Sequence, residues 1–337
     1  IDMLISCGEI ISSVVLANHL CEKGYKVEVL SGYQAGILTD SNFGNAEIEN
    51  VDPSRILKHL EQNNIVIVSG FQGSNKYGEI TTLGRGGSDI SAVAIGQAIG
   101  CEHIEIFTDV DGIMTADPNI VSNAKVLSKM CYSEVYQLAE DGAKVIHPRA
   151  VEMAQQFNIP LIIKNTYSNN DGTFIEGIDT SFISNRKNLS NEKIITAITY
   201  KKDRVQIKIS LDDKNSCKLN KLMETIATNK ISLDLINFLV EQKIFTIGND
   251  DLDNLISIMD NENLHYEIIK NCCKISVIGY KMQGVPGVMA RIMKALIGEN
   301  IKILQTSDSH NTIWCLVKEV DMDKALFALH REFKLYE

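Results

Sequence analysis

The stretch TTLGRGGSD, residues 81–89, combines three glycines with a cation, a hydroxyl and a carboxylate. The glycines allow the backbone to approach a ligand closely, and Ser88 or Asp89 stands where it can cap the helix that the next apolar residues predict. A helix N-terminus binds anions, and the planar guanidinium of Arg85 suits a carboxylate or a phosphate. The stretch matches neither GxxxxGK[ST] nor GxGxxG. It predicts an anion site of another kind, and a glycine-rich turn with a routine helix cap is an equal alternative.

A second polar stretch, FTDVDGIMTADPN at residues 107–119, contains Asp109, Asp111 and Asp117 after a strand-like run. Such a loop can hold nucleotide hydroxyls, or Mg²⁺ directly or through water. An ordinary loop of Asx turns is the alternative, because Asp and Gly mix in many turns.

A third stretch, GAKVIHPRA at residues 142–150, carries Lys144, a point charge suited to a phosphate, although a single lysine is most often a surface residue. We expect His147 in the same stretch to be a packed side chain. The seven histidines form no HxxxH or HExxH pair and the eight cysteines form no CxxC pair. These spacings predict no zinc or other protein-held metal site, and free thiols in a reducing compartment.

Composition limits the class of partner. The 337 residues carry a formal net charge of −10, which argues against nucleic acid or an anionic membrane as the main partner. The first ten residues contain no Lys or Arg, unlike a signal peptide, and no apolar run approaches the ~18 residues of a membrane span. We therefore expect a cytoplasmic protein with a small-molecule partner.

Strand-like and helix-like runs alternate over residues 1–168 and predict a parallel α/β sheet, with ligands beyond the carboxyl ends of the strands. Residues 169–192 are rich in Asn, Asp, Gly, Ser and Thr and predict a linker. The remainder contains a weak repeat, because KLMETIATNKISLDLI and RIMKALIGENIKILQT, which start at Lys221 and Arg291, share one apolar pattern. This predicts two packed βαββαβ-like units, at 193–260 and 261–337; two coincidentally similar segments are the alternative.

In this order and spacing, SCGE, QAG, GEITTLGRGGSD, EIFTDVDGIMTADP and LAEDGAKVIHPRAVEMA resemble the aspartate kinases of the amino-acid kinase superfamily. GVPGVMARIMKAL with ILQTSDSHNTIWCLV is similar to the second of their paired, ferredoxin-like ACT domains. The resemblance covers nearly the whole chain. It implies an amino-acid-kinase α/β sandwich followed by two ACT domains, phosphorylation of the aspartate side-chain carboxylate by MgATP, no tightly bound cofactor, feedback control by an amino acid and a homo-oligomer.

The resemblance also assigns roles to single positions. Glu9 would hold the substrate amino group, Arg85 its α-carboxylate with Ser88 beside it, and Asp89 would orient the catalytic groups. Lys144 is the other expected catalytic group. The residues expected near the nucleotide are Thr108, Asp109, Met114, Asp117 and Lys144.

Three departures from the family pattern stand out. No KxGG segment with its phosphate-contacting lysine matches, and loss of one such cation costs on the order of 10²- to 10³-fold in rate. We therefore expect that an N-terminal stretch of roughly sixty residues or more precedes this sequence, by comparison with α/β domains of this kind. Met114 and Asn119 stand where many relatives have Tyr and Arg.

An effector amino acid is expected at the second repeated unit, where QGVPGV precedes a helix whose N-terminus can receive a carboxylate. In relatives the effector often uses the first unit, and simple packing of ACT sheets into a dimer is the alternative. Lysine is the expected effector, with diaminopimelate or threonine as alternatives. The expected contacts are Val285, Gly287, Val288, Gln305, Ser307 and Asp308.

Two other functions fit parts of the sequence. A kinase for acetylglutamate, glutamate or UMP would share the nucleotide loop, but GRGGSD together with two ACT-like units favours aspartate. A non-catalytic amino-acid sensor that regulates a partner subunit is favoured by the missing KxGG lysine.

Overall fold

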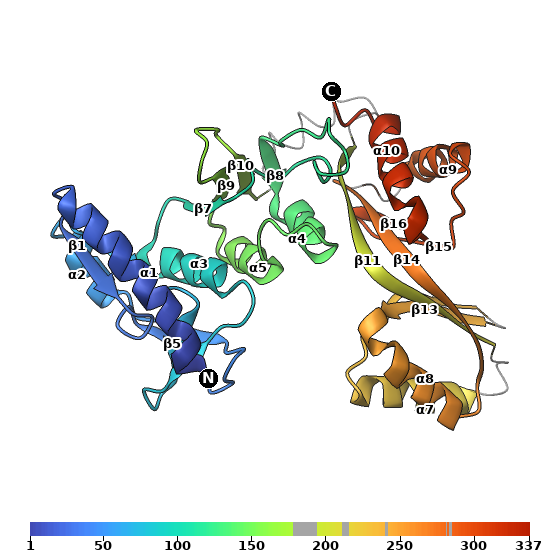
Figure 1. The fold of residues 1–337 in the computed structure, drawn as a ribbon, viewed down its shortest axis with the longest axis horizontal. Coiled ribbons are helices and arrows are strands. Elements are labelled where there is room, and N and C mark those ends of the chain that lie inside the picture. Colours follow the sequence, from blue (N-terminus) through green and yellow to red (C-terminus); the bar gives the residue numbers. More distant parts are fainter. Residues whose placement is uncertain (178–193, 211–215, 240–241, 281, 283–284) are drawn as a thin grey trace. The chain divides into compact units, whose positions relative to one another are not determined.

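The chain forms two compact units, seen in a computed structural model that describes residues 1–177, 194–210, 216–239, 242–280, 282 and 285–337 (Figure 1). Each unit collects segments that are separate in sequence. Unit 1 consists of Ile1–Ile113, Val126–Ala139 and Lys144–Thr180. Unit 2 consists of Met114–Lys125, Glu140–Ala143 and Ser181–Glu337.

Unit 1 alternates strands and helices, as the sequence predicts. Its helices are α1 (Asp2–Glu22), α2 (Ser54–Leu60), α3 (Gly87–Ile99), α4 (Tyr132–Glu140), whose last residue belongs to unit 2, and α5 (Pro148–Phe157). Its strands are β1 (Val27–Leu30), β2 (Ile37–Thr39), β3 (Ile48–Val51), β4 (Ile65–Val68), β5 (Gln72–Ser74), β6 (Ile80–Thr82), β7 (Ile104–Thr108), β8 (Lys129–Cys131), β9 (Leu161–Asn165) and β10 (Thr173–Glu176).

The predicted strands pair in parallel, β1 with β4 and β7 with β9, but within different sheets. Shorter antiparallel pairs lie beside them, such as β5 with β6 and β9 with β10. Strand β10 lies inside the segment 169–192 that the sequence predicted as a linker, and Thr173 and Ile175 are buried. The residues before β10 are polar, and for that reason the sequence did not predict this strand of four residues. The prediction of a linker is therefore wrong for the first part of the segment. Residues 178–192 of the predicted linker lie outside the described residues.

Helix α1 turns a polar face inward. Its buried residues include Asp2, Ser6 and Ser13, whereas Leu4 and Val15 are exposed. The Asp2 carboxylate accepts hydrogen bonds from the backbone of Gly44 and Thr82, and these bonds outweigh burial, so the pKa of Asp2 is lowered. Contrary to the expectation from the sequence, α1 is long and apolar enough to cross a membrane by length and composition alone. Core helices of soluble proteins and signal sequences pass the same test.

Unit 2 is built on a six-stranded sheet with the order β12-β13-β11-β14-β16-β15. Its strands are β11 (Ile195–Ser210), β12 (Asp234–Phe238), β13 (Gln242–Gly248), β14 (His265–Gly279), β15 (Gln305–Asp308) and β16 (Thr312–Lys318). Its helices are α7 (Ser216–Thr228), α8 (Leu252–Asn261), α9 (Val288–Gly298) and α10 (Met322–Glu332), with short 3₁₀ turns η3 (Asn249–Asp251) and η4 (Glu319–Asp321).

The long strands β11 and β14 run side by side through both halves of unit 2, with α7 and α8 near one end and α9 and α10 near the other (Figure 1). The two ends have separate cores. Val205, Ile207 and Phe245 pack with α7 and α8 in what we call the first repeat. Ile198, Ile275 and Val277 pack with α9 and α10 in the second repeat. The first part of β11 therefore packs in the core of the second repeat, and the first part of β14 packs in the core of the first repeat.

Two segments that the sequence placed in the kinase region 1–168 pack within unit 2 instead. Ala116 and Val121 belong to the core of the second repeat. Thr115 shares a hydrogen bond of 3.0 Å with His330 of α10, and both are buried. The backbone around residue 142 lies against β11, because a Cβ at Gly142 would come within 2.2 Å of the Tyr200 carbonyl oxygen. These segments pack against residues of the second repeat that are distant in sequence. Local sequence patterns could not indicate such contacts.

Candidate active site and effector site

The glycine-rich stretch forms the tight turn that starts helix α3. Gly86 stands at the N-cap in the left-handed region, with φ of 70°, where glycine is favoured because it has no Cβ. Asp89 lies in the first turn of α3, and Ser88 and Arg85 are exposed beside it. The turn therefore places the N-terminus of α3 beside an exposed guanidinium, the combination that an anion site requires.

Helix α5 meets this turn at its own N-terminus. His147 caps α5 by accepting a hydrogen bond from the Arg149 N–H, with Pro148 in the first turn. The backbone N–H of His147 donates to Asp89 Oδ2 at 3.1 Å. Burial raises the pKa of Asp89, against the lowering effect of this bond. The His147 side chain is thus packed at the start of α5, as the sequence predicts, and its backbone N–H holds Asp89.

The contact between the N-termini of α3 and α5 explains why residue 86 is a glycine. A Cβ at Gly86 would lie 2.2 Å from the His147 ring. No side chain fits there without displacing His147 and with it the partner of Asp89. The helix start is also tied to the segment after β4, because Phe71 donates its N–H to Ser91 Oγ at 2.9 Å.

Glu9 is held between two tied positions of helix α1. Gln72 Nε2 donates to the Ser6 carbonyl at 3.2 Å, and Ser69 Oγ donates to Ser13 Oγ at 3.0 Å. Ser69 and Gln72 flank the end of β4 and the start of β5, next to the turn described above. The sequence did not single out these polar residues; the signal was a serine-rich stripe on an otherwise apolar helix.

The end of β7 supplies the next predicted group. Thr108 Oγ1 donates to Asp109 Oδ1 at 3.2 Å, and the Asp109 side chain is exposed. The Asp111 carboxylate is already engaged, because it accepts from Asn165 at 2.7 Å and from Ser168 at 3.1 Å. Asp111 therefore closes the loop onto the end of β9, and Asp109 is the carboxylate of this pair that solvent reaches.

Met114 and Asp117, predicted for nucleotide binding, lie in the segment that packs with unit 2. Asp117 Oδ2 accepts a hydrogen bond of 3.0 Å from the Tyr200 hydroxyl, and its Oδ1 accepts from Asn119. Burial and this carboxylate raise the pKa of Tyr200 to about 12. Both oxygens of Asp117 thus have protein partners, and Asn119 orders the turn.

Lys144 is exposed, two residues after Gly142. Gly142 takes a φ of 119°, a value that side-chain-bearing residues rarely adopt. Among the described residues no three His, Cys, Asp or Glu side chains gather as a metal cluster would.

The second repeat contains a cavity of about 280 Å³ at the start of α9. Three of the predicted effector residues line it, Val285, Val288 and Asp308, together with Met282, Met289, Ser309 and Ile313. Gly287 is the left-handed N-cap of α9, with φ of 93°. Ser307 is half-buried on the neighbouring strand β15. One apolar wall, one carboxylate and one helix N-terminus thus meet at this cavity.

Gln305 takes a different place from the one predicted. Its side chain donates to the Leu235 carbonyl and to Asn237 Oδ1, and it accepts from Gln206 Nε2 at 2.9 Å. Gln305 therefore joins edge strand β15 of the second repeat to edge strand β12 of the first.

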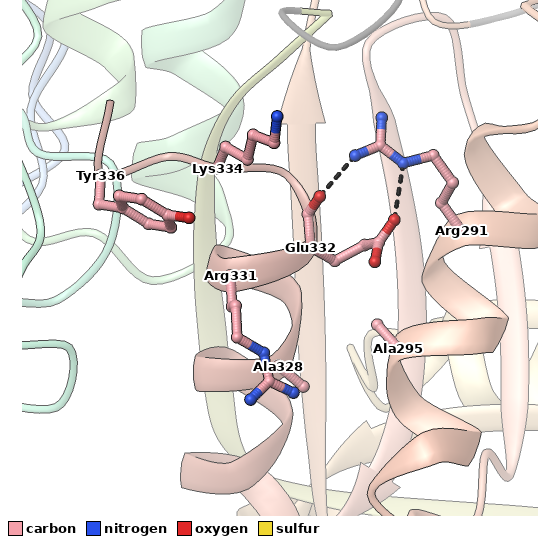
Figure 2. A pocket seen from close by; sticks show the side chains of 7 residues that line it. All are labelled: Arg291, Ala295, Ala328, Arg331, Glu332, Lys334 and Tyr336. Atoms are coloured by element: carbon pink, nitrogen blue, oxygen red, sulfur yellow. Dashed lines mark hydrogen bonds and ion pairs between the residues drawn. The ribbon is translucent and has the colours of Figure 1, made fainter.

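A larger cavity, of about 490 Å³, lies between α9 and the end of α10 (Figure 2). Arg291 points onto Glu332, with Nε 2.8 Å from Oε1, and stacks on Phe333 at 4.5 Å. Arg331 points away from Arg291 in Figure 2 and pairs with Glu299 at 2.8 Å. Both arginines are used to hold α9 and α10 together.

Comparisons with known proteins were made for the whole chain. Residues 1–165 match the model of the amino acid kinase family, and residues 267–331 match an ACT domain. Aspartokinase 1 of Bacillus subtilis is 41% identical over 334 residues, 99% of this chain and 82% of the relative. The aspartokinase of Geobacillus stearothermophilus is 36% identical over the whole chain and 82% of its own length. The chain belongs to the aspartokinase family.

Solved aspartokinases share the fold. Escherichia coli aspartokinase III in complex with aspartate and ADP superimposes with a TM-score of 0.79 at 25% identity, over 98% of this chain and 75% of that one. The same enzyme with lysine and aspartate gives 0.77 over the same shares. The aspartokinase resemblance, the α/β fold with its C-terminal ACT domain and the kinase activity predicted from the sequence are thereby confirmed.

An aspartokinase needs ATP as co-substrate and an ionised carboxylate as acceptor. A carboxyl group with a pKa near ~4 is ionised at neutral pH. This aspartokinase therefore needs no general base, and catalysis depends on positioning and on cations around the transferred phosphoryl group. The match to the amino acid kinase family covers residues 1–165 and therefore includes the apolar helix α1.

Proposed function

We propose that this kinase converts L-aspartate and MgATP to aspartyl 4-phosphate, the first step toward lysine, threonine and methionine, in the cytoplasm and under feedback control. The observation that carries the proposal is the α3 turn, where an exposed arginine and a helix N-terminus lie beside a carboxylate fixed by the His147 backbone. A substrate with two carboxylates and one ammonium group needs this combination of charges.

The substrate contacts follow from charge. Arg85 pairs with the α-carboxylate of aspartate, with Ser88 beside it, and Glu9 accepts the substrate ammonium group. Asp89 orients these groups through its position in the first turn of α3. The exposed side chain of Arg85 and the half-buried side chain of Glu9 support this assignment, because each can meet a ligand.

The nucleotide contacts come from two loops. Thr108 and Asp109, at the carboxyl end of β7, contact ATP, since ligands of parallel sheets bind at that end. Lys144 offers its charge to the phosphates. For Met114 and Asp117 the nucleotide contact rests on the family resemblance alone, and the Asp117 carboxylate already has two protein partners.

Feedback control acts through the ACT repeats. The cavity at the start of α9 suits an amino acid, whose carboxylate meets the helix N-terminus and whose ammonium group meets Asp308. We propose lysine as the effector, because one of the similar structures was solved with lysine; diaminopimelate and threonine are the alternatives. The domain bounds proposed are a kinase region that extends through strand β10 and ACT units at 193–260 and 261–337.

The ACT repeats also provide a surface for a homo-oligomer. Strand β12 is an edge of the six-stranded sheet, and Ile236, Phe238 and Leu239 on and after it are 50%, 44% and 56% exposed. Because Gln305 already joins β12 to β15, the exposed apolar side chains, and not a free strand edge, favour contact with a second copy.

The proposal is tested by trapping aspartyl phosphate with hydroxylamine. Protein expressed from its whole coding sequence is incubated with MgATP and aspartate, and acetylglutamate and glutamate are tested in the same way. UMP is tested by ADP release, because its product is not an acyl phosphate and hydroxylamine does not trap it. The proposal is supported if aspartate is the one substrate of the panel that gives product and if lysine suppresses formation of that product. Product from another member of the panel points to a different amino-acid kinase. No product from any of them, with lysine still bound, identifies a regulatory subunit.

A further inference from the structure

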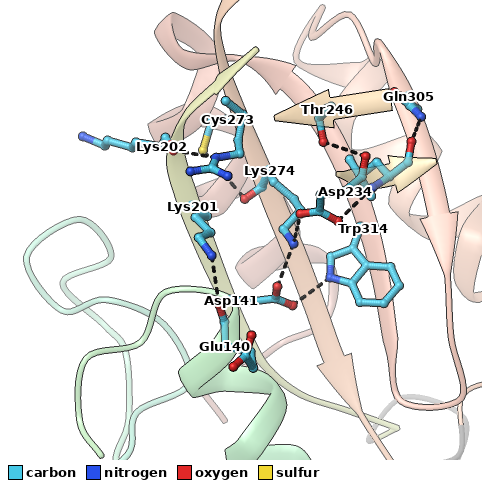
Figure 3. Close-up of polar contacts among 12 residues, drawn as sticks. Glu140, Asp141, Lys201, Lys202, Asp234, Thr246, Cys273, Lys274, Gln305 and Trp314 are labelled. Atoms are coloured by element: carbon cyan, nitrogen blue, oxygen red, sulfur yellow. Dashed lines mark hydrogen bonds and ion pairs between the residues drawn. The ribbon is translucent and has the colours of Figure 1, made fainter. Parts of the chain in front are cut away.

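A buried ion-pair network in unit 2 is centred on Lys274 of strand β14 (Figure 3). Its Nζ lies 2.9 Å from Asp141 Oδ1 and 2.6 Å from Asp234 Oδ2, and its side chain is 6% exposed. Trp314 of β16 donates its indole N–H to Asp141 Oδ2 at 2.7 Å. The Lys274 ammonium group also lies 5.6 Å from the Trp314 ring centroid.

The two carboxylates of the network keep Lys274 protonated. Burial disfavours a charged lysine, but the two carboxylates outweigh that effect, so the pKa of Lys274 is raised. Lys274 therefore keeps its charge at neutral pH. Removing one partner of a buried ion pair costs much more than breaking a surface pair, because the other charge remains buried. Lys274 thus strongly favours the arrangement in which both carboxylates are near.

The three partners come from three parts of the chain. Asp141 lies in segment 140–143, which follows α4 and immediately precedes Lys144. Asp234 begins strand β12 of the first repeat. Lys274 and Trp314 belong to neighbouring strands of the sheet, with Lys274 opposite Leu316. One ammonium group thus ties segment 140–143 to strands of both repeats.

Segment 140–143 is fixed by backbone contacts as well. The Glu140 carbonyl accepts from Lys201 Nζ at 3.4 Å. Gly142 leaves no room for a Cβ above the Tyr200 carbonyl. The backbone that leads into Lys144 is therefore set by β11, β14 and β16 of unit 2.

We propose that Lys274, through Asp141, is a positioning residue that sets the backbone from which Lys144 meets the nucleotide. This rests on the role of Lys144 given under the proposed function. A cation that stabilises a transferring phosphoryl group must be placed within about 0.5 Å, and displacement by about 1 Å can cost 10²-fold. Asp234 makes the same network sensitive to the position of strand β12.

Asp141→Asn is the decisive variant. Asparagine keeps the shape and the acceptor for Trp314, but it removes the charge that faces Lys274, which stays paired with Asp234. We expect the KM for ATP and the dissociation constant of ADP, measured by calorimetry, to rise about 5-fold or more, in the range of typical coupling between sites. The KM for aspartate should stay within about 2-fold, since the coupling acts on the nucleotide side.

Two further variants complete the test. Lys274→Arg keeps a cation between the carboxylates. This variant should retain most of the ATP affinity of the wild type. Asp260→Asn is the matched control, because Asp260 also accepts a hydrogen bond from an aromatic side chain, Tyr266 at 2.7 Å, but at an exposed position of helix α8. It should leave both KM values unchanged.

Unchanged ATP and ADP affinity in Asp141→Asn, with only a lower melting temperature, would overturn the proposal in favour of a purely structural role. If that variant does not fold, Trp314→Phe replaces it: a rise of about 2-fold in the KM for ATP supports the proposal, and no rise overturns it. If the wild type forms no aspartyl phosphate, the activity assignment fails by itself, and the ADP titration still decides whether segment 140–143 positions the nucleotide contact.

Discussion

The Asp89 carboxylate accepts the backbone N–H of His147 at 3.1 Å and so joins the N-termini of helices α3 and α5. The two residues are 58 positions apart in the sequence. Because the bond uses backbone on one side, it fixes Asp89 without depending on the protonation of a partner side chain. The proposed aspartate site is therefore built on the junction of two helices.

Asp89→Asn should remove most of the activity while leaving this junction intact. Asparagine can still accept from His147, but it lacks the charge that orients the substrate groups. We expect kcat to fall about 10²- to 10³-fold, as for the loss of one preorganised group. Steady-state assays check this, with Asp253→Asn, at an exposed position in the first turn of α8, as the control. A kcat within a few-fold of the wild type would remove Asp89 from the catalytic set.

The same variant should be more stable than the wild type at neutral pH. Burial raises the pKa of Asp89 in the folded state above 3.8. The folded protein then binds the proton more tightly than the unfolded chain, and this contribution to stability is lost as pH rises through the folded pKa. Urea unfolding at pH 7 and near pH 4 measures the difference. An advantage of the variant that is larger at the lower pH would contradict the sign.

Gly86→Ala should damage both stability and substrate binding. The added Cβ must adopt a left-handed conformation and displace the His147 ring, so we expect a loss of about 1–3 kcal/mol. Because His147 moves, kcat/KM for aspartate should fall as well. The control is Gly298→Ala at the end of α9, where a Cβ meets nothing within 4 Å; it should change stability by less than about 1 kcal/mol. Equal effects of the two variants would show that the contact with His147 is unimportant.

The Tyr200–Asp117 hydrogen bond should appear in a double-mutant cycle of Tyr200→Phe and Asp117→Asn. We expect a coupling of about 0.5–1.5 kcal/mol in the free energy of unfolding, the range for one hydrogen bond. Thermal or urea unfolding of the four proteins provides the values. Additive effects on stability, together with a large increase in the KM for ATP in Asp117→Asn alone, would show that Asp117 serves the nucleotide and not Tyr200.

Asp308→Asn should weaken inhibition without weakening catalysis. The carboxylate is the only acidic side chain among the described residues that line the cavity at the start of α9. Losing its pairing with the ammonium group of the effector should raise the inhibition constant about 10- to 150-fold, as for a charged hydrogen bond of 1.5–3 kcal/mol. Inhibition curves with lysine, diaminopimelate and threonine measure it, with Asp321→Asn as the control. Unchanged inhibition would place the effector elsewhere, with the first repeat as the next candidate.

Local signals were sufficient for much of this protein. The GRGGSD turn, the alternation of strands and helices and the repeated helix-strand pattern depend on residues near one another in sequence, so spacing alone predicts them. The cap of α3 differs from the prediction, because Gly86 and not Ser88 or Asp89 stands at the N-cap and no side chain caps the helix. The cap of α5 at His147 was not predicted. The α/β class of the first part of the chain follows from these patterns, and the kinase assignment came from the resemblance of the motifs to those of aspartate kinases.

Contacts between distant residues required the tertiary structure. Trp314 and Asp141 are 173 residues apart, and Thr115 and His330 are 215 apart. No local pattern specifies such pairs, because their energy comes from burying charges and apolar surface against whatever the fold brings near. The sequence therefore determined which chemistry the chain carries. Only the tertiary structure decided that the segment leading to Lys144 is fixed by the regulatory sheet.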